Sequence, residues 1–233
     1  MAMKISYINM IADLCEQTGA DVDGVAQGMG LDRRIGKAFL RAGIGYGGSC
    51  FPKDTQALIT IGKQNQVAMP LVEAAVTINR SRPKEMLKRL ERACGGLKGR
   101  TIGMWGLTFK PDSDDLREAP SIPFSRLALE AGAEVVAYDP LIRREFPVDD
   151  IRLFNDPYQV AQSSDATILM TEWEEFRSLD WSRVLGGREQ WVLLDARNLY
   201  SLHEMKRIAQ RFPLTYLSVG RPCVHPKQPA AVL

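Results

Sequence analysis

After Gly99 the sequence alternates short apolar runs with helix-like segments, and this alternation constrains the fold more than any other feature. The apolar runs are Thr101–Leu107, Glu134–Tyr138, Ala166–Met170, Trp191–Leu194 and Leu214–Val219. The segment Ser121–Ala131, which Gly132 ends, is typical of a helix between the first two runs. Strands that alternate with helices favour a parallel sheet wound on both faces. The sequence therefore predicts a doubly wound, Rossmann-like α/β fold for this part.

The residues before position 95 follow a helical pattern instead. The pattern predicts helices over Ile5–Cys15, from an Asp21 cap to Met29, over Pro52–Gln64 and over Pro70–Cys94. Pro83 is expected to kink the last helix or to split it in two. A length of 233 residues allows one or two domains. We therefore expect a helical domain over 1–95 and a sheet domain over 96–233.

The composition excludes several classes of partner. The 30 basic and 28 acidic residues leave a net charge of +2, so bulk charge gives no reason to expect binding to nucleic acid or to a membrane surface. No apolar run approaches the roughly 18 residues of a membrane-spanning helix. Asn9 and Asp13 interrupt the opening segment, which therefore does not resemble a secretion signal.

The four cysteines are far apart in the sequence, at Cys15, Cys50, Cys94 and Cys223. None forms a C-x-x-C pair, and the two histidines are isolated, so we expect no metal site. Free thiols in a chain of this size are typical of the reducing cytoplasm. Apart from Cys50, we expect the cysteines to have structural roles.

A glycine-rich stretch runs from Gly43 to Asp54, with the sequence GIGYGGSCFPKD. It fits the G-x-G-x-x-G spacing by chance. No strand pattern precedes it, and no acidic residue follows at about the 20 positions that a dinucleotide site requires. We therefore reject a dinucleotide-binding interpretation of this stretch.

Cys50 is the candidate nucleophile of this stretch. The glycines let backbone N–H groups approach a ligand, and the positive end of the helix that follows would stabilise a thiolate. Asp54 falls in the first turn of that helix, within reach of a water molecule or proton near the sulfur. The alternatives are a buried structural cysteine and an aspartate that only pairs with the helix dipole.

Two further motifs lie in the second half. The first is Gly103–Lys110, followed by Asp114–Glu118, which predicts a strand, a glycine turn and a helix N-terminus that binds an anion. Lys110 and Arg117 would add positive charge to this site. The alternative is a glycine turn that serves packing alone. Arg197 follows the strand near Leu194 and suits a phosphate or carboxylate; the alternative is a surface arginine. Asp139 as a ribose-binding acid is the less favoured interpretation.

The stretch Gly45–Asp54 resembles the active-site signature of the UDP-glucose/GDP-mannose dehydrogenase family. The segments Arg34–Gly36, Phe109–Lys110, Asp115–Glu118, Asp195–Tyr200 and Ser218–Pro222 place the chain nearer the UDP-glucose branch of that family. Arg41, where relatives often carry lysine, and Ala196, where glycine is common, are mild departures. The resemblance implies NAD-dependent, four-electron oxidation of UDP-glucose to UDP-glucuronate.

The resemblance also implies a role for each site residue. Cys50 would add to the C6 aldehyde, the thiohemiacetal would lose hydride to give a thioester, and Asp54 would help to activate the hydrolytic water. The NAD cofactor would face Cys50, Phe51, Pro52, Lys53 and Arg117. The UDP-sugar would contact Arg41, Ala42, Gly43, Ile44, Gly45, Tyr46, Gly47, Phe109, Lys110 and Arg197. Arg34 would reach the substrate of a neighbouring subunit, in a homodimer formed through the helical domain.

Relatives begin with an NAD-binding domain, whereas this sequence opens within the helical domain. The lysine, asparagine, threonine and glutamate that the family uses in catalysis would fall before Met1. The resemblance therefore implies a C-terminal portion that is inactive by itself. Two alternatives remain open: a non-catalytic, dimeric nucleotide-sugar-binding module, and a dehydrogenase of GDP-mannose or UDP-N-acetylmannosamine.

Overall fold

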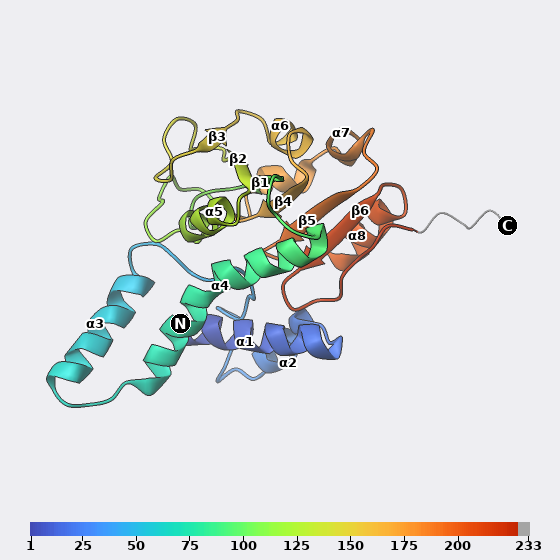
Figure 1. Cartoon of the computed structure of the whole chain (residues 1–233). Coiled ribbons are helices and arrows are strands. Elements are labelled where there is room, and N and C mark those ends of the chain that lie inside the picture. The colour runs from blue at the N-terminus through green and yellow to red at the C-terminus, as the bar shows by residue number, and fades with distance from the viewer. Residues whose placement is uncertain (228–233) are drawn as a thin grey trace.

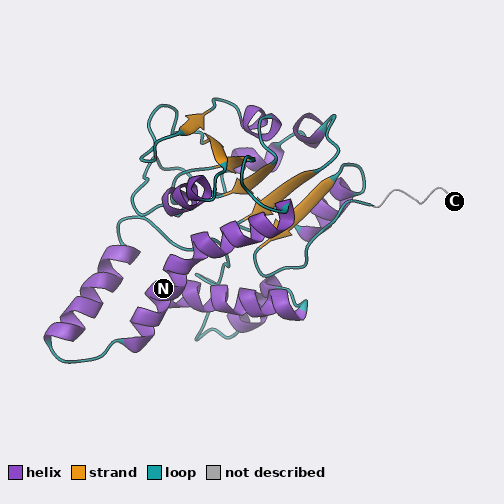
Figure 2. Ribbon diagram, in the orientation of Figure 1, coloured by secondary structure: helices purple, strands orange, loops and turns teal. Residues whose placement is uncertain are grey.

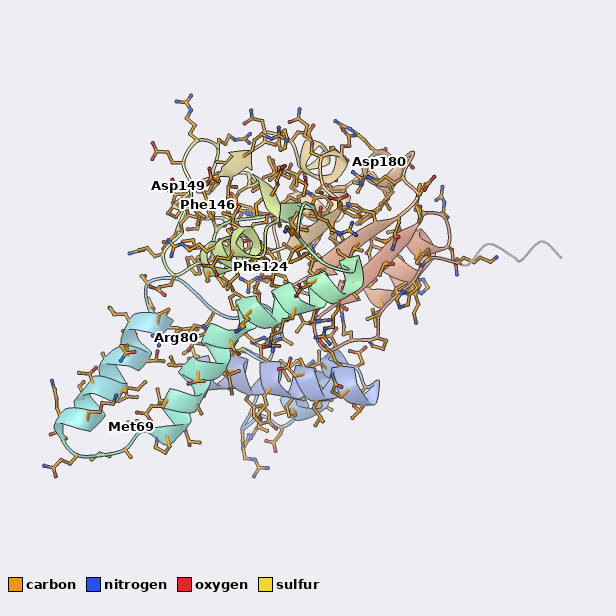
Figure 3. All side chains as sticks on the ribbon, viewed as in Figure 1. Met69, Arg80, Phe124, Phe146, Asp149 and Asp180 are labelled. Carbon is orange, nitrogen blue, oxygen red and sulfur yellow. The ribbon has the colours of Figure 1, made fainter. Side chains whose placement is uncertain are left out.

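Helices form the N-terminal part of the computed structural model, which describes residues 1–227 (Figure 1). They are α1 (Ala2–Thr18), α2 (Val22–Leu31), α3 (Phe51–Gln64) and α4 (Pro70–Cys94). The connection from α3 to α4 carries Met69, and this helical hairpin projects from the rest of the chain (Figure 3). None of the helices within residues 1–227 combines the length and apolarity needed to cross a bilayer.

Local sequence signals explain where α1 and α2 begin and end. The predicted apolar stripe of α1 is buried through Ile8, Ala12 and Cys15. Asp21 caps α2, because its side chain accepts a hydrogen bond from the Asp23 N–H at 2.9 Å. The helix was predicted to end at Met29, but α2 continues through Gly30 to Leu31.

The helix α4 runs unbroken through Pro83, so the alternative of two separate helices is wrong (Figure 1). A proline inside a helix costs about 3 kcal/mol, because one backbone hydrogen bond is lost. Met86, Leu87 and Leu90 follow Pro83 and are buried, and each such side chain contributes roughly 1.5–3 kcal/mol. Burial of this face therefore outweighs the break that proline introduces.

The C-terminal part forms one six-stranded parallel sheet, which confirms the predicted fold class. The strands are β1 (Thr101–Trp105), β2 (Glu134–Tyr138), β3 (Ile151–Leu153), β4 (Ala166–Leu169), β5 (Trp191–Asp195) and β6 (Leu214–Ser218). Their spatial order is β3-β2-β1-β4-β5-β6. The edge strand β3 is only three residues long and lacks an apolar run, so the sequence pattern missed it.

Helices cover both faces of the sheet (Figure 2). One face packs against α4 and α5 (Ser121–Glu130). The other face packs against α6 (Pro157–Gln162), α7 (Trp181–Leu185) and α8 (Leu202–Ala209), near the short 3-10 helix η1 (Glu174–Ser178). Residues of β5 alternate between the two cores: Val192 and Leu194 face α4, whereas Trp191 and Leu193 face the other layer.

The first of these cores crosses the boundary proposed between the two domains. It contains Ile8 of α1 and Leu90 of α4 together with Ile102 of β1 and Val192 of β5. The helical part and the sheet therefore share one apolar interior. The division into two domains between residues 95 and 96 remains a prediction. Residues 228–233, at the end of the predicted sheet domain, lie outside the described part of the chain.

Arg82 of α4 ties these helices together from inside the core. Its side chain is 1% exposed, its Nη1 pairs with Asp13 of α1 at 2.6 Å, and its Nε donates to the Gly43 carbonyl at 3.3 Å. We expect Arg82→Ala to lower the free energy of unfolding by about 3 kcal/mol, because it empties buried volume and removes a donor. Urea unfolding followed by circular dichroism measures this change.

The matched control is Lys84→Ala, two residues along the same helix at an exposed position. It should change the free energy of unfolding by less than about 0.5 kcal/mol. Equal losses in the two variants would contradict the role given to Arg82.

Candidate active site

Two asparagines of the helical part hold the glycine-rich loop, residues 41–49. Asn9 of α1 accepts a hydrogen bond from the Gly43 N–H at 2.8 Å. Asn79 of α4 accepts from the Tyr46 N–H at 2.8 Å and donates to the Tyr46 carbonyl at 2.9 Å. Gly45 has φ +106°, and a Cβ there would lie 2.6 Å from the Asn79 Oδ1. Only glycine at position 45 therefore allows Asn79 to make both of these hydrogen bonds.

The sheet part holds the same loop from the opposite side. The Ile44 N–H donates to the Ala196 carbonyl at 2.9 Å, and the Gly48 N–H donates to the Arg117 carbonyl at 2.8 Å. A Cβ on Gly47 would overlap the carbonyl oxygen of Glu118. The loop is thus fixed between α1 and α4 on one side and the connections after β5 and β1 on the other.

Arg197 joins three segments at the carboxyl edge of the sheet. Its guanidinium donates to the carbonyls of Met170 at 2.7 Å, Gly45 at 3.0 Å and Phe109 at 3.3 Å. The side chain is only 14% exposed. The alternative of a surface arginine is therefore wrong: Arg197 is built into the wall between the glycine-rich loop and the sheet.

A cavity of about 440 Å³ lies between the glycine-rich loop and the carboxyl ends of β1, β4 and β5. It is lined by Ile5, Ala38, Phe39, Arg41, Gly43, Gly45, Tyr46, Gly47, Phe51, Phe109, Lys110, Glu172 and Arg197. Nine of these residues are among those for which sequence resemblance predicts substrate or cofactor contacts. Positions more than 150 residues apart therefore meet around one space that can hold a ligand.

The charge of this cavity is mainly positive. Arg41, Lys110 and Arg197 contribute cationic groups, and the Lys110 Nζ lies 5.4 Å from the centre of the Phe109 ring. Among residues 1–227, Glu172 contributes the only carboxylate of the lining. Such a set suits an anionic ligand that also carries a hydrogen-bond donor.

Cys50 is not among the residues that line this cavity, but it directly precedes Phe51, which does. It is the N-cap residue of α3 and is exposed, so the alternative of a buried structural cysteine is wrong. The Ser49 Oγ lies 3.8 Å from its Sγ. The neighbouring Phe51 lines the cavity, with its ring 5.6 Å from that of Tyr46 and 5.9 Å from that of Phe39. The sulfur is thus accessible at the positive end of a 14-residue helix.

Lys53 and Asp54 follow in the first turn of α3 and also lie outside the lining. The Lys53 Nζ is 3.6 Å from the Asp54 Oδ1, and the two side chains are 77% and 68% exposed. Pro52 lines a separate cavity of about 240 Å³ together with Tyr46, Thr55 and Arg80. None of Pro52, Lys53 and Asp54 therefore lines the larger cavity.

Two arginines outside the lining are each held by an aspartate two residues earlier. The Arg117 Nη2 lies 2.7 Å from Asp115, and the Arg34 Nη2 lies 2.5 Å from Asp32. These hydrogen bonds lower the pKa of both carboxyl groups. The Arg34 side chain is 85% exposed and does not line this cavity.

The turn after β1 does not form the predicted anion site. The Asp139 carboxylate is fully buried and accepts hydrogen bonds from the Leu107 N–H at 2.7 Å, the Thr108 N–H at 3.3 Å and the Trp173 Nε1 at 3.1 Å. An internal carboxylate thus occupies the donors that a phosphate would need. The same contacts exclude Asp139 as a ribose-binding acid of this sheet.

Some lining residues were missed, and some predicted ones do not reach the cavity. Ala42 and Ile44 are buried in the hydrophobic core and are not among the residues that line this cavity. Ile5 was assigned only to the apolar stripe of α1, and nothing in the sequence pattern marks Ala38 or Phe39. Glu172, by contrast, lies two residues after the predicted strand Ala166–Met170, and the rule that ligands gather at strand carboxyl ends would have found it.

Two family models match most of the chain. The central domain of the UDP-glucose/GDP-mannose dehydrogenase family matches residues 1–81, and the UDP-binding domain of the same family matches residues 103–202. The second match includes Phe109, Lys110, Glu172 and Arg197, which line the cavity. The two matches therefore meet at the candidate site.

Similar proteins agree with these matches. The chain is 44% identical over 95% of its length to a UDP-glucose 6-dehydrogenase of Rhizobium meliloti, covering 51% of that protein. It is 41% identical over 99% of its length to the UDP-glucose 6-dehydrogenase TuaD of Bacillus subtilis, covering 50% of it. A UDP-glucose dehydrogenase structure from Pyrobaculum islandicum superposes with a TM-score of 0.83 at 34% identity, over 95% of this chain and 48% of that one.

The chain spans about half the length of these curated relatives. The segments that match the central and UDP-binding domains both contribute residues to the cavity described above. The chain belongs to the UDP-glucose/GDP-mannose dehydrogenase family.

Proposed function

We propose that this chain supplies the nucleotide-sugar pocket and the nucleophile of a UDP-glucose 6-dehydrogenase. One observation carries the proposal: a basic cavity lies between the glycine-rich loop and the sheet, and the exposed Cys50 directly precedes Phe51 of its lining. Lys110 and Arg41 suit the diphosphate of a nucleotide sugar, and the apolar and aromatic lining suits its base and its hexose ring. Names of the similar proteins support UDP-glucose as the substrate.

The sulfur of Cys50 performs covalent chemistry at C6 of the hexose in this proposal. Loss of a first hydride from C6 and of the proton on its hydroxyl oxidises the C6 alcohol to an aldehyde. The Cys50 thiolate then forms a C–S bond to this aldehyde as the carbonyl oxygen takes up a proton, giving a thiohemiacetal. Loss of hydride from C6 turns this adduct into a thioester, and attack by water releases the carboxylate and the free thiol. Asp54, in the first turn of α3, accepts a proton from the attacking water.

NAD is the cofactor that this chemistry needs, and it accepts the hydride when bound. Lys53 and Arg117 fit such a group, because both are exposed cations near the N-terminus of α3 and suit a dinucleotide phosphate or carboxamide. The turn after β1 does not fit the pyrophosphate, because Asp139 fills it. We therefore propose that this chain contributes only one side of the cofactor site and does not oxidise substrate by itself.

Isothermal titration tests the proposed function. We expect the chain to bind UDP-glucose, and to bind GDP-mannose at least about ten-fold more weakly, a difference of about 1.4 kcal/mol. With NAD⁺ and UDP-glucose present, absorbance at 340 nm should not rise. Preferred binding of GDP-mannose would indicate the other branch of the family. No binding of either nucleotide sugar would contradict the proposal, and steady NADH production would contradict the expected inactivity.

Alkylation tests the role given to Cys50. We expect iodoacetamide at pH 7 to modify Cys50 faster than Cys15 or Cys94, as measured by peptide mass spectrometry. Cys50 is exposed at a helix N-terminus, whereas burial raises the pKa of the Cys15 and Cys94 thiols and so removes reactive thiolate. In urea the three rates should converge. Equal rates in the folded chain would argue against Cys50 as an activated nucleophile.

The helical part also supports a homodimer. Met3, Tyr7, Met10 and Leu14 are 42–59% exposed and recur at spacings of four and three along the outer face of α1. This spacing places them in one stripe, as in a helix that packs against a second helix. Arg34 points outward beside this stripe, at a cavity shared with Met3 and Tyr7. A second copy would therefore cover the stripe and receive this arginine.

Light scattering coupled to size exclusion tests the homodimer. We expect the wild-type chain to have the mass of a dimer and Met10→Glu to have that of a monomer, because a carboxylate would be buried at the centre of the stripe. Lys206→Glu, at an exposed position of α8, is the control and should remain dimeric. A wild-type monomer, or a Met10→Glu dimer, would contradict this interface.

A further inference from the structure

Glu172 places a carboxylate in a cavity that is otherwise cationic. Its side chain is 29% exposed, and its Oε2 is buried without a hydrogen-bond donor among residues 1–227. The Arg197 Nε lies 3.4 Å from this oxygen but donates its hydrogen to the Met170 carbonyl at 2.7 Å. The carboxylate therefore lacks a hydrogen bond within the chain, and its exposed part is what can accept one from a ligand.

The fold sets Glu172 at the position where a nucleotide is expected. It follows β4, while Phe109 and Lys110 follow β1 and Arg197 follows β5. The strand order β3-β2-β1-β4-β5-β6 reverses its direction of winding between β1 and β4. In open α/β sheets, ligands bind outside the carboxyl ends of the strands at this crevice.

Arg197 does not need Glu172 to hold it. Its guanidinium already donates to the carbonyls of Met170, Gly45 and Phe109. A carboxylate next to the phosphates of a nucleotide is repelled by their negative charge, unless the part of the ligand that faces the carboxylate is a neutral hydrogen-bond donor. The ribose is the neutral, donor-bearing group that adjoins the diphosphate, and its two hydroxyls suit a carboxylate.

We propose that Glu172 accepts a hydrogen bond from a ribose hydroxyl of the bound nucleoside diphosphate. This inference rests on the proposed function, since it assigns a specificity residue to the same cavity. The apolar side chains of Ile5, Phe39 and Phe51 line the cavity from the helical part. The ribose and the phosphates would therefore lie on the opposite side, along the edge of the sheet. The site would thereby distinguish ribonucleotides from their deoxy forms.

Titration calorimetry with UDP, 2′-deoxy-UDP and 3′-deoxy-UDP tests this inference without the hexose. We expect the wild-type chain to lose about ten-fold in affinity when the contacted hydroxyl is removed, as for a hydrogen bond to a charged group. Glu172→Gln should bind UDP about ten-fold more weakly than the wild-type chain. It should distinguish UDP from the deoxy nucleotides by less than about two-fold. This loss of discrimination is the result that a purely structural role would not produce.

Glu174→Gln is the matched control, because Glu174 is an exposed carboxylate two residues away that pairs with Arg177 on the surface. It should keep the wild-type discrimination, and thermal melting should show that both variants fold. If Glu172→Gln weakens UDP and both deoxy nucleotides equally, or if the wild-type chain binds all three equally, the inference is wrong. If the wild-type chain binds no UDP at all, the proposed function itself fails.

Discussion

The glycine-rich loop depends on being hydrogen-bonded from both sides at once. Asn79 of α4 makes two hydrogen bonds to the backbone of Tyr46, while the Ala196 carbonyl accepts from Ile44 on the sheet side. Buried backbone groups must find partners, so this loop has a fixed path only when α4 and the sheet are packed together. The shared core provides that packing, and the cavity and the exposed position of Cys50 both follow from it.

The general fold could be predicted from the sequence because its signals are local. The strands with long apolar runs and the helices opened by Pro52 and Pro70 lie close to where their periodicity places them. Two details depend on tertiary contacts instead. The path of α4 through Pro83 follows from burial of the residues after it, and β3 exists because Ile151–Leu153 pair with β2. Neither interaction leaves a periodic signal.

The candidate site could be predicted only in part. Motif resemblance marked Phe109, Lys110 and Arg197, and the structure brings these residues to one cavity with the glycine-rich loop. The resemblance did not reveal that the Arg197 guanidinium donates hydrogen bonds to three backbone carbonyls. Arg197 is therefore part of the cavity wall as well as a source of positive charge. The glycine-turn pattern, considered apart from the resemblance, predicted an anion site after β1, where the Asp139 carboxylate already accepts hydrogen bonds from the Leu107 and Thr108 N–H groups. Contacts between distant side chains decide such cases.

A crystal structure of the chain with UDP-glucose tests the central claim most directly, namely that one cavity built by the helical part and the sheet presents a nucleotide sugar to Cys50. The account predicts a diphosphate beside Lys110 and Arg41, and C6 of the hexose directed toward the Cys50 Sγ, close to the roughly 3.5 Å of a reactive contact. Nucleotide density at another site, or a hexose whose C6 points away from the sulfur, would contradict it.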